Sequence, residues 1–269
     1  MQDLFKSCIF YEKKKKMKKW FIKKMNFVIA AMLALLIVFS SCNDDEYYYV
    51  PYYSYVLPNA LVTVKSDTDQ AVFLQLDDNT TLKPVNMPTS PFGNKEVRAL
   101  MNAYLVDADP GKYSQAVYVN WIDSILTKPI AKDLGENNDN VYGTDPVDIL
   151  NDWVTIAEDG YLTLRFVAPW TKSAPAHYVN LLLTNNPKDP YELKFYHNAY
   201  GDTSGEMASG IVAFNLSSLP DTNGKTVKLT LKWKSFDGEK TKVFDYCTRK
   251  STSSETSEIA VERSVIKMY

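Results

Sequence analysis

Histidine is the side chain best suited to acid–base or metal chemistry near neutral pH, and this chain has only two, His177 and His197. A metal or acid–base site would require both imidazoles to converge with a carboxylate. The two residues lie in different strand-like segments and match no HxH or HExxH spacing. The sequence therefore favours two strand histidines that are each held by a hydrogen bond, and it predicts no metal ligands.

Cys247 is the cysteine that could act as a nucleophile. A thiol becomes reactive when a nearby base or cation lowers its pKa. Cys247 lies in the segment VFDYCTRK, whose alternation of apolar and polar residues indicates a strand. Because free cysteines are often buried as small apolar residues, we expect a core position and no catalytic role.

Neighbouring carboxylates are the remaining candidates for catalysis. They occur at Asp77 and Asp78, at Asp107 and Asp109, at Glu158 and Asp159, and at Asp44 and Asp45. A glycosidase needs two carboxylates that face each other about 5–9 Å apart across a groove. These pairs lie in predicted turns, where aspartate is favoured because it bonds the nearby backbone. The oxygen-rich segment DADPG could attract calcium, but it lacks the spacing and the distal glutamate of an EF-hand loop, so turn residues are the better interpretation. We therefore predict no catalytic residues, no cofactor and no enzyme.

A run of lysines is the most distinctive surface feature. Lys228, Lys232 and Lys234 alternate with apolar residues and should share the solvent face of one strand, and Lys240 and Lys242 could extend it. One interpretation is a binding face for an anionic partner, such as an acidic protein or a glycan. The other is a solvated sheet face whose charges deter aggregation. The sequence leaves both open.

Strands must position all of these side chains, because most segments alternate with period two and turn residues recur about every ten positions. Residues 59–65, 71–76, 96–106 and 113–128 predict curved strands, and in the last of these Val117, Val119 and Trp121 should share one face. Such strands favour a small closed barrel over residues 58–138. Tyr104, Tyr118 and Trp121 could form a small oligosaccharide platform there, although aromatic residues are more often core.

A polar break over residues 132–145 suggests a domain boundary near residue 140, and residues 146–153 could form one helical turn capped by Asp145. The strand pattern then resumes. The Asp159–Gly160 pair predicts a hairpin, and Leu162, Leu164 and Phe166 should share one face. Later strands predict a β-sandwich over residues 139–250, followed by a tail over residues 251–269.

The N-terminal region predicts export. Lysines precede an uncharged apolar run over residues 27–39, which is shorter than the roughly 20 residues that span a bilayer. Residues 1–41 therefore read as a signal peptide, of which residues 1–16 could be an over-extended start. Ser40 and Ser41 lead directly into Cys42, which resembles the lipobox of bacterial lipoproteins. That resemblance implies a diacylglyceryl group on Cys42 that anchors the protein to a membrane.

Acidic residues follow the cysteine at once. Asp44, Asp45 and Glu46 resemble the export signal that carries some lipoproteins to the outer leaflet of the outer membrane, although acids also suit a solvated tether. The tyrosine-rich residues 47–55 could be an extended tether or a first strand, and we favour a tether over residues 42–57. The expected location is the outer membrane at the cell surface, with its periplasmic face as the alternative.

The charge of the chain argues against nucleic-acid binding, and its cysteine content argues against an internal disulfide. From Cys42 onward the chain has 30 acidic and 21 basic residues, which argues against nonspecific nucleic-acid binding. Cys8 leaves with the signal peptide and Cys42 carries lipid, so Cys247 has no partner for an internal disulfide.

Several segments resemble the NigD-like lipoproteins of Gram-negative anaerobes, notably LPNALVTVK, EVRALMNAYLVDAD, VYVNWIDSILTK, EDGYLTLRF and GKTVKLTLKWKSFDGEKTKVFDYC. The resemblance covers most of residues 57–249. It implies an N-terminal OB-like domain, a C-terminal β-sandwich and a role in bacteriocin immunity, and it carries over no catalytic residues. We therefore expect a non-enzymatic surface lipoprotein that binds an unknown protein or peptide. The alternative is a glycan-binding accessory lipoprotein of an uptake system.

Overall fold

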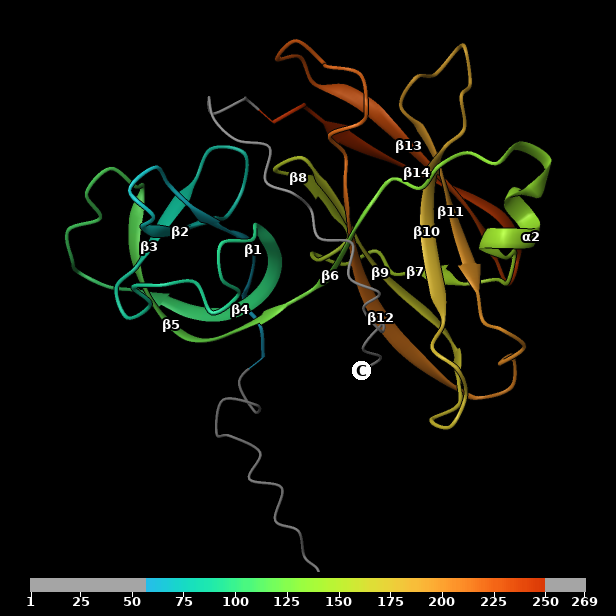
Figure 1. Ribbon diagram of the computed structural model, residues 1–269, viewed down its shortest axis with the longest axis horizontal. Coiled ribbons are helices and arrows are strands. Elements are labelled where there is room, and N and C mark those ends of the chain that lie inside the picture. The colour runs from blue at the N-terminus through green and yellow to red at the C-terminus, as the bar shows by residue number, and fades with distance from the viewer. Residues whose placement is uncertain (1–56, 250–269) are drawn as a thin grey trace, which may run out of the picture. The chain divides into compact units, whose positions relative to one another are not determined.

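The structure, a computed structural model, describes residues 57–249 and consists almost entirely of strands (Figure 1). The all-β prediction is confirmed. Its helical parts are a 3₁₀ turn at Gly135–Asn137 and the short helix α2 at Asn138–Tyr142. Within the described residues no helix is long and apolar enough to cross a membrane.

The first five strands close into a small barrel, as predicted. They are β1 (Ala60–Ser66), β2 (Val72–Gln75), β3 (Thr81–Pro84), β4 (Val97–Leu105) and β5 (Gln115–Ser124). They follow the order β1-β2-β3-β5-β4, and β1 pairs with β4 to close the barrel. Every pairing is antiparallel except that of β3 with β5. Alternate residues point inward, so Val62, Val64, Ala99 and Met101 fill the interior.

A β-bulge changes which residues of β5 enter the barrel. The register between β4 and β5 shifts between Asn102 and Ala103. Val117 and Val119 point inward as predicted, but beyond the bulge Ile122 packs against the same core. Trp121 therefore does not share their face, and that prediction was wrong, because the extra residue reverses the alternation of the strand.

The predicted domain boundary at residues 138/139 is too late. The segment 113–128, predicted as one strand, is divided between β5 and β6 (Leu126–Pro129). β6 pairs in parallel with β12 (Glu206–Asn215), which belongs to the sandwich. The alternating pattern runs through both strands, so it contains no sign that the chain leaves one sheet and enters another.

The C-terminal part is a β-sandwich of two sheets. One sheet has the order β10 (Tyr178–Leu183), β11 (Glu192–Asn198), β13 (Val227–Ser235) and β14 (Gly238–Tyr246). The other has the order β6, β12, β9 (Tyr161–Trp170) and β7 (Asp148–Ile149), with β8 (Ile156–Glu158) paired to β9. Leu162, Leu164 and Phe166 share the core face as predicted.

Two local predictions in the sandwich have opposite outcomes. The hairpin at Asp159 and Gly160 is confirmed, since both residues have positive φ, 47° and 73°, between β8 and β9. The helical turn predicted at residues 146–153 is wrong, because this segment contains β7, whose residues pair with β9. Asp145 caps no helix, and its Oδ2 instead accepts a hydrogen bond from the backbone N–H of Ala199 at 2.7 Å.

Strand β9 is buried on both of its faces. Its core face packs inside the sandwich, and on the opposite face Tyr161 lies in a second apolar cluster with Leu61 of the barrel and Ala213 of β12. The described residues of barrel and sandwich belong to one compact unit. The barrel therefore covers the outer face of the five-stranded sheet and fixes what surrounds β8 and β9.

Candidate functional site

The structure brings the two histidines together with a carboxylate. His197 lies in β11 as predicted, whereas His177 lies in the loop immediately before β10, so the strand position predicted for His177 was wrong. The two residues still approach each other, because β10 pairs with β11. His177 Nδ1 lies 3.0 Å from His197 Nε2, and His177 Nε2 lies 3.2 Å from Asp202 Oδ2. Asp202 also accepts hydrogen bonds from the backbone N–H and the hydroxyl of Thr171. Asp202 follows His197 by only five residues, but it lies in the loop after β11 and no sequence pattern predicted that it would meet His177.

This cluster is a buried hydrogen-bonded chain that runs from His197 through His177 to Asp202. His177 and His197 are only 3% and 2% exposed. Burial, followed by the charge of His177, lowers the pKa of His197 to about 4, so His197 is neutral at pH 7. If His177 donates its Nε2–H to Asp202, its Nδ1 accepts from His197, whose own Nδ1 has no partner. Residues 57–249 hold no group of three or more His, Cys, Asp or Glu side chains arranged for a metal ion.

Among the described residues, the thiol of Cys247 has hydrogen-bond contacts with a hydroxyl and with the Thr248 carbonyl oxygen, to which it donates at 3.7 Å. Cys247 is half-buried after β14, and its Sγ lies 3.6 Å from the hydroxyl oxygen of Thr222. A hydroxyl at that distance cannot take the thiol proton in the way an imidazole does.

The predicted turn carboxylates differ in what they bond. Asp77 Oδ1 accepts from the backbone N–H groups of Asn79 and Thr80, and Asp109 Oδ1 accepts from that of Gly111. These are the local turn contacts expected from the sequence. Glu158 and Asp159 instead form ion pairs with residues of the barrel, which sequence spacing gave no means of predicting.

Arg98 of β4 is the centre of one such contact. Its side chain is completely buried between barrel and sandwich. It donates to the hydroxyl of Thr63 at 3.1 Å, to that of Thr163 at 3.4 Å, and to the carboxylate of Glu158 on β8. Burial raises the pKa of Glu158, and the Arg98 charge opposes that rise.

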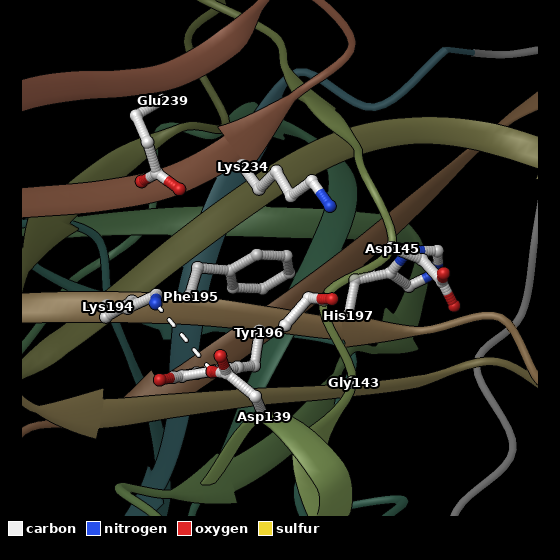
Figure 2. Close-up of a pocket in the computed structure, with 10 residues that line it drawn as sticks. Asp139, Gly143, Asp145, Lys194, Phe195, Tyr196, His197, Lys234 and Glu239 are labelled. Atoms are coloured by element: carbon white, nitrogen blue, oxygen red, sulfur yellow. Dashed lines mark ion pairs between the residues drawn. The ribbon is translucent and has the colours of Figure 1, made fainter. Parts of the chain in front are cut away.

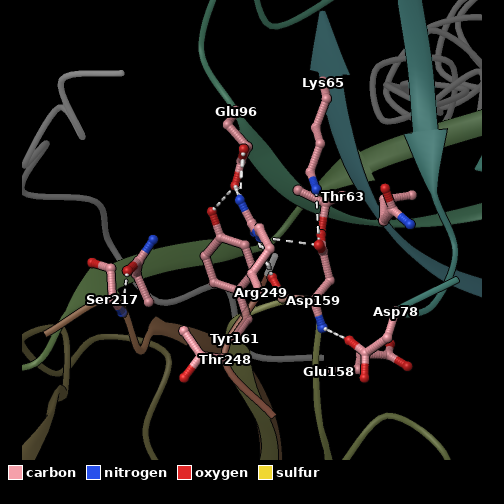
Figure 3. Close-up of polar contacts among 12 residues, drawn as sticks. Thr63, Lys65, Asp78, Glu96, Glu158, Asp159, Tyr161, Ser217, Thr248 and Arg249 are labelled. Atoms are coloured by element: carbon pink, nitrogen blue, oxygen red, sulfur yellow. Dashed lines mark hydrogen bonds and ion pairs between the residues drawn. The ribbon is translucent and has the colours of Figure 1, made fainter. Parts of the chain in front are cut away.

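Asp159 is the centre of the adjoining contact (Figure 3). Lys65 Nζ lies 2.8 Å from its Oδ1, and Arg249 Nε lies 3.0 Å from the same oxygen. Arg249 also pairs with Glu96 at 2.8 Å, and Glu96 accepts a hydrogen bond from the Tyr161 hydroxyl at 2.5 Å. We name the residues that carry these contacts the interdomain polar cluster: Lys65, Glu96, Arg98, Glu158, Asp159 and Arg249.

The lysines of β13 share the solvent face of the sheet, as the pattern predicts. Lys228 Nζ lies 2.5 Å from Asp245, and Lys232 Nζ lies 2.8 Å from Glu192. Their charges are therefore neutralised within the sheet. Lys234 is exposed and has no ion pair with any residue in the described part of the chain.

Lys240 and Lys242 do not extend this lysine face. Lys240 pairs in register with Trp233, and Lys242 pairs with Leu231, so both lie on the opposite side of the sheet from Lys232 and Lys234. The suggestion was wrong because the two-residue turn of the β13–β14 hairpin fixes the register, and a shift of one residue exchanges the faces.

Lys234 lines a cavity of about 260 Å³ on the solvent side of the four-stranded sheet (Figure 2). Strand β11 forms the floor with Lys194 and Tyr196, the segment after α2 forms one wall, and the β13–β14 hairpin forms another with Lys234 and Glu239. We call this the mixed-charge cavity, because Asp139 and Asp145 also line it. Asp145, His197 and Lys234 are notable from the sequence for other reasons, but nothing in the sequence pattern brings them together. Asp139, Lys194 and Glu239 come from α2, β11 and β14, and sequence spacing gives no means of grouping them.

Gly143 allows the segment after α2 to pack closely against β11. Its φ is +80°, and a Cβ at this position would lie 2.5 Å from Asn198 Cβ and 2.6 Å from the carbonyl oxygen of His197. Only glycine permits both the backbone conformation and the close approach of the chain to β11. The backbone N–H of Asp145 then donates to the same His197 carbonyl at 2.9 Å.

On the barrel, the predicted aromatic residues have unequal positions. Tyr104 and Tyr118 are 52% and 40% exposed, and their rings stack with centroids 5.4 Å apart and planes inclined by 22°. Trp121 is half-buried. The expectation that these aromatic residues are core was therefore wrong for the two tyrosines, which pair with each other near the loop that joins β4 and β5.

The proposed lipid and export residues lie outside the described residues. Cys42, Asp44, Asp45 and Glu46 precede Leu57, as does the tyrosine-rich segment over residues 47–55, and the tail from residue 251 follows Arg249. The expectations for these segments stay predictions.

A closed five-stranded barrel of this strand order, followed by a β-sandwich, defines a two-domain all-β protein with an OB-type N-terminal domain. The NigD-like N-terminal OB domain matches residues 61–125, and the NigD-like C-terminal beta sandwich domain matches residues 129–246. The chain belongs to the NigD-like family. The two matches also meet where β5 ends and β6 begins. No curated protein matches the chain.

Solved structures extend the comparison. A protein from Parabacteroides distasonis ATCC 8503, described as toxin-related, is 40% identical with a TM-score of 0.59, covering 70% of this chain and 92% of that chain. A protein of unknown function from Bacteroides vulgatus ATCC 8482 is 26% identical with a TM-score of 0.57, covering 70% of this chain and 89% of that chain. A NigD-like immunity protein from Bacteroides caccae ATCC 43185 is 19% identical with a TM-score of 0.48, covering 70% of this chain and 93% of that chain.

Proposed function

We propose that this protein is a non-enzymatic lipoprotein, anchored to the outer membrane through Cys42 and displayed at the cell surface, that binds a protein or peptide. In its specific form the role is immunity against a secreted toxin. The observation that carries the proposal is the 40% identity to the toxin-related Parabacteroides distasonis protein, over 92% of that chain. The lipobox-like sequence before Cys42 supports the anchor.

The buried histidine cluster supports a binding role over catalysis. General acid–base work requires an imidazole that reaches substrate and titrates near the working pH. His177 and His197 are almost completely buried, and the pKa of His197 is about 4. Neither imidazole is therefore open to a substrate, and His197 does not titrate near neutral pH.

Protease shaving of intact cells tests anchoring and display. Cells would express the full chain with a C-terminal tag, and a blot would report whether external protease removes the tag. We expect removal in the unmodified chain and release of the protein from membranes in Cys42→Ala. The matched control is Cys8→Ala, which changes a cysteine upstream of the apolar run and should leave anchoring intact. Protection of the tag until the outer membrane is opened would contradict surface display.

Immunity is tested separately by a killing assay. Cells with and without the chain would be exposed to culture supernatants of related strains that secrete toxins. Survival conferred by the chain, and lost in Cys42→Ala, is the expected result. Equal killing of both populations across producing strains would contradict the immunity role and leave the anchoring result unaffected.

Exposed aromatic residues favour a second candidate, a glycan-binding accessory lipoprotein. Tyr104 and Tyr118 present stacked rings beside the loop that joins the last two barrel strands, a region that binds oligosaccharides in some OB folds. Affinity electrophoresis in polysaccharide gels would test it. Tyr104→Ala should abolish any retardation, whereas Tyr178→Ala, which removes a sandwich tyrosine of 41% exposure, should not. Retardation that survives Tyr104→Ala would exclude this platform.

A further inference from the structure

The geometry of the mixed-charge cavity points to a site for a small zwitterion, and we propose that it binds the ammonium and carboxylate groups of a free amino acid or a short peptide. The proposal rests on the binding role proposed above and assigns that role a ligand class. It concerns the sandwich alone and does not involve the barrel tyrosines.

The walls of the cavity are held in place by contacts that do not involve a ligand. Asp145 bonds the backbone of β11 in both directions, through its own N–H to His197 and through its carboxylate from Ala199. The end of β13 is fixed by the backbone N–H of Val147, which donates to the Lys234 carbonyl at 3.0 Å, and by the Ser235 hydroxyl, which donates to Asp148. A cavity with anchored walls loses little entropy on binding.

The charges around the cavity are of both signs and are incompletely paired. Lys194 Nζ lies 4.0 Å from Asp139 Oδ1 and 4.7 Å from the centre of the Tyr196 ring. The Lys194 ammonium therefore already interacts with two residues that line the cavity. Lys234 and Glu239 face each other in register but form no ion pair with any residue in the described part of the chain. In Figure 2 their side chains extend in different directions around the opening.

A ligand with both charges satisfies this arrangement better than a simple ion. An anion would approach Lys234 but would also meet Asp145 and Glu239, and a cation alone would leave the Lys234 ammonium unpaired. Like charges brought together at a binding site cost affinity, whereas complementary charges fix orientation. The ligand ammonium is therefore assigned to the carboxylate side, at Glu239, and the ligand carboxylate to Lys234.

The size of the cavity limits the ligand. Sites for drug-sized molecules occupy about 300–1,000 Å³. A volume of about 260 Å³ is slightly smaller and suits one or two amino-acid residues. Because so few atoms make contact, and the lysine and glutamate are exposed to water, we expect a Kd of about 1 mM.

Saturation-transfer difference NMR on the purified full chain would test the proposal, since it detects weak ligands directly. The probes are L-alanyl-L-alanine and L-alanine, which carry both charges, N-acetyl-L-alanine, which carries only the carboxylate, and L-alanine methylamide, which carries only the ammonium. We expect the Kd of the zwitterions to be at least about tenfold lower than that of either singly charged probe. The relative Kd of alanine and dialanine distinguishes a free amino acid from a peptide as the ligand.

Substitutions locate the site. Lys234→Met and Glu239→Gln should each raise the Kd of the zwitterion at least about fivefold, because each removes one of the two charge contacts. The matched control is Lys240→Met, in the same hairpin on the opposite face, which should leave the Kd unchanged. Urea midpoints would confirm that all three variants fold like the parent chain.

The proposal would be overturned by absence of saturation transfer to any probe, or by binding that is unchanged in both Lys234→Met and Glu239→Gln. Equal binding of the singly charged probes would likewise exclude a zwitterion site. These failures differ from failure of the proposed function, because anchoring and killing assays do not use these probes. Protection that persists in Lys234→Met would reject the cavity and keep the immunity role.

Discussion

The interdomain polar cluster and the mixed-charge cavity use the same residue types in opposite environments. In the polar cluster Arg98 is completely buried and Asp159 is 3% exposed, and each is matched to one or more countercharges. In the mixed-charge cavity Lys234 and Glu239 are exposed and have no ion-pair partner among the described residues.

The difference separates charges that serve stability from charges available to a ligand. A buried charge without a partner costs several kcal/mol, so burial between two domains requires complete pairing. An exposed charge is already solvated by water and can remain unpaired at little cost. Complete pairing at the domain contact is therefore a structural property, whereas incomplete pairing around a preformed cavity leaves charges free to meet a ligand.

The largest expected effect comes from breaking the buried pair at the domain contact. Arg98→Met removes the countercharge of Glu158, whose side chain is 14% exposed, and leaves the hydroxyls of Thr63 and Thr163 without their donor. We expect the free energy of unfolding to fall by about 3–5 kcal/mol. Urea denaturation followed by circular dichroism would measure it.

The double variant Arg98→Met/Glu158→Gln is the control for that result. Neutralising Glu158 removes the uncompensated charge, so the double variant should regain at least half of the lost stability. If it is as unstable as Arg98→Met alone, lost packing and not charge explains the effect. The proposed difference between the paired charges of the interdomain polar cluster and the unpaired charges of the mixed-charge cavity would then lose support.

The next effect is a pH dependence from buried His197. The pKa of His197 is lowered to about 4 from its ordinary value of 6.5, so between these values the unfolded chain binds more protons than the folded one. The contribution of neutral His197 to the free energy of unfolding is fully present above pH 6.5. The free energy of unfolding should fall by about 3 kcal/mol as the pH drops towards 4. Urea midpoints at pH 7 and pH 4.5 would measure this loss, which should be smaller in His197→Gln. An identical pH profile in His197→Gln would show that His197 does not cause the pH dependence.

Gly143 links the cavity wall to stability. Gly143→Ala would place a Cβ 2.5 Å from Asn198 Cβ and 2.6 Å from the His197 carbonyl oxygen, well inside van der Waals contact, at a φ of +80°. We expect the free energy of unfolding to fall by about 2 kcal/mol, from backbone strain and steric overlap together. Gly111→Ala is the control, because Gly111 has a φ of +64° but nothing within 4 Å. Equal losses in the two variants would show that strain alone matters and that the wall tolerates a shift.

The smallest effect is expected on the lysine face. Lys228 and Asp245 are 72% and 67% exposed, so their ion pair is weak. Lys228→Ala should change the free energy of unfolding by less than about 0.5 kcal/mol. A loss above 1 kcal/mol would mean that exposed pairs on this sheet behave like the buried pairs of the interdomain polar cluster.

Local pattern was enough for much of the fold because it reflects local geometry. Alternate side chains of a strand point to opposite faces, so Leu162, Leu164 and Phe166 could be assigned to one core face from spacing alone. The Asp159–Gly160 turn could be predicted because few residues adopt positive φ. The resemblance to NigD-like proteins supplied the order of the two domains, since long matching segments occur in the same sequence order.

The sequence by itself determined the strands, the two all-β domains and the faces of the lysines in β13. Only the tertiary structure decided where Trp121 points, that β6 belongs to the sandwich, and that Asp202 meets His177, which in turn meets His197. It also decided that Arg98 meets Glu158 across the domain contact and that Lys234 shares a cavity with Lys194 and Glu239. The physical reason is that alternation fixes direction within one strand, whereas bulges, register and pairing between distant strands determine which side chains meet.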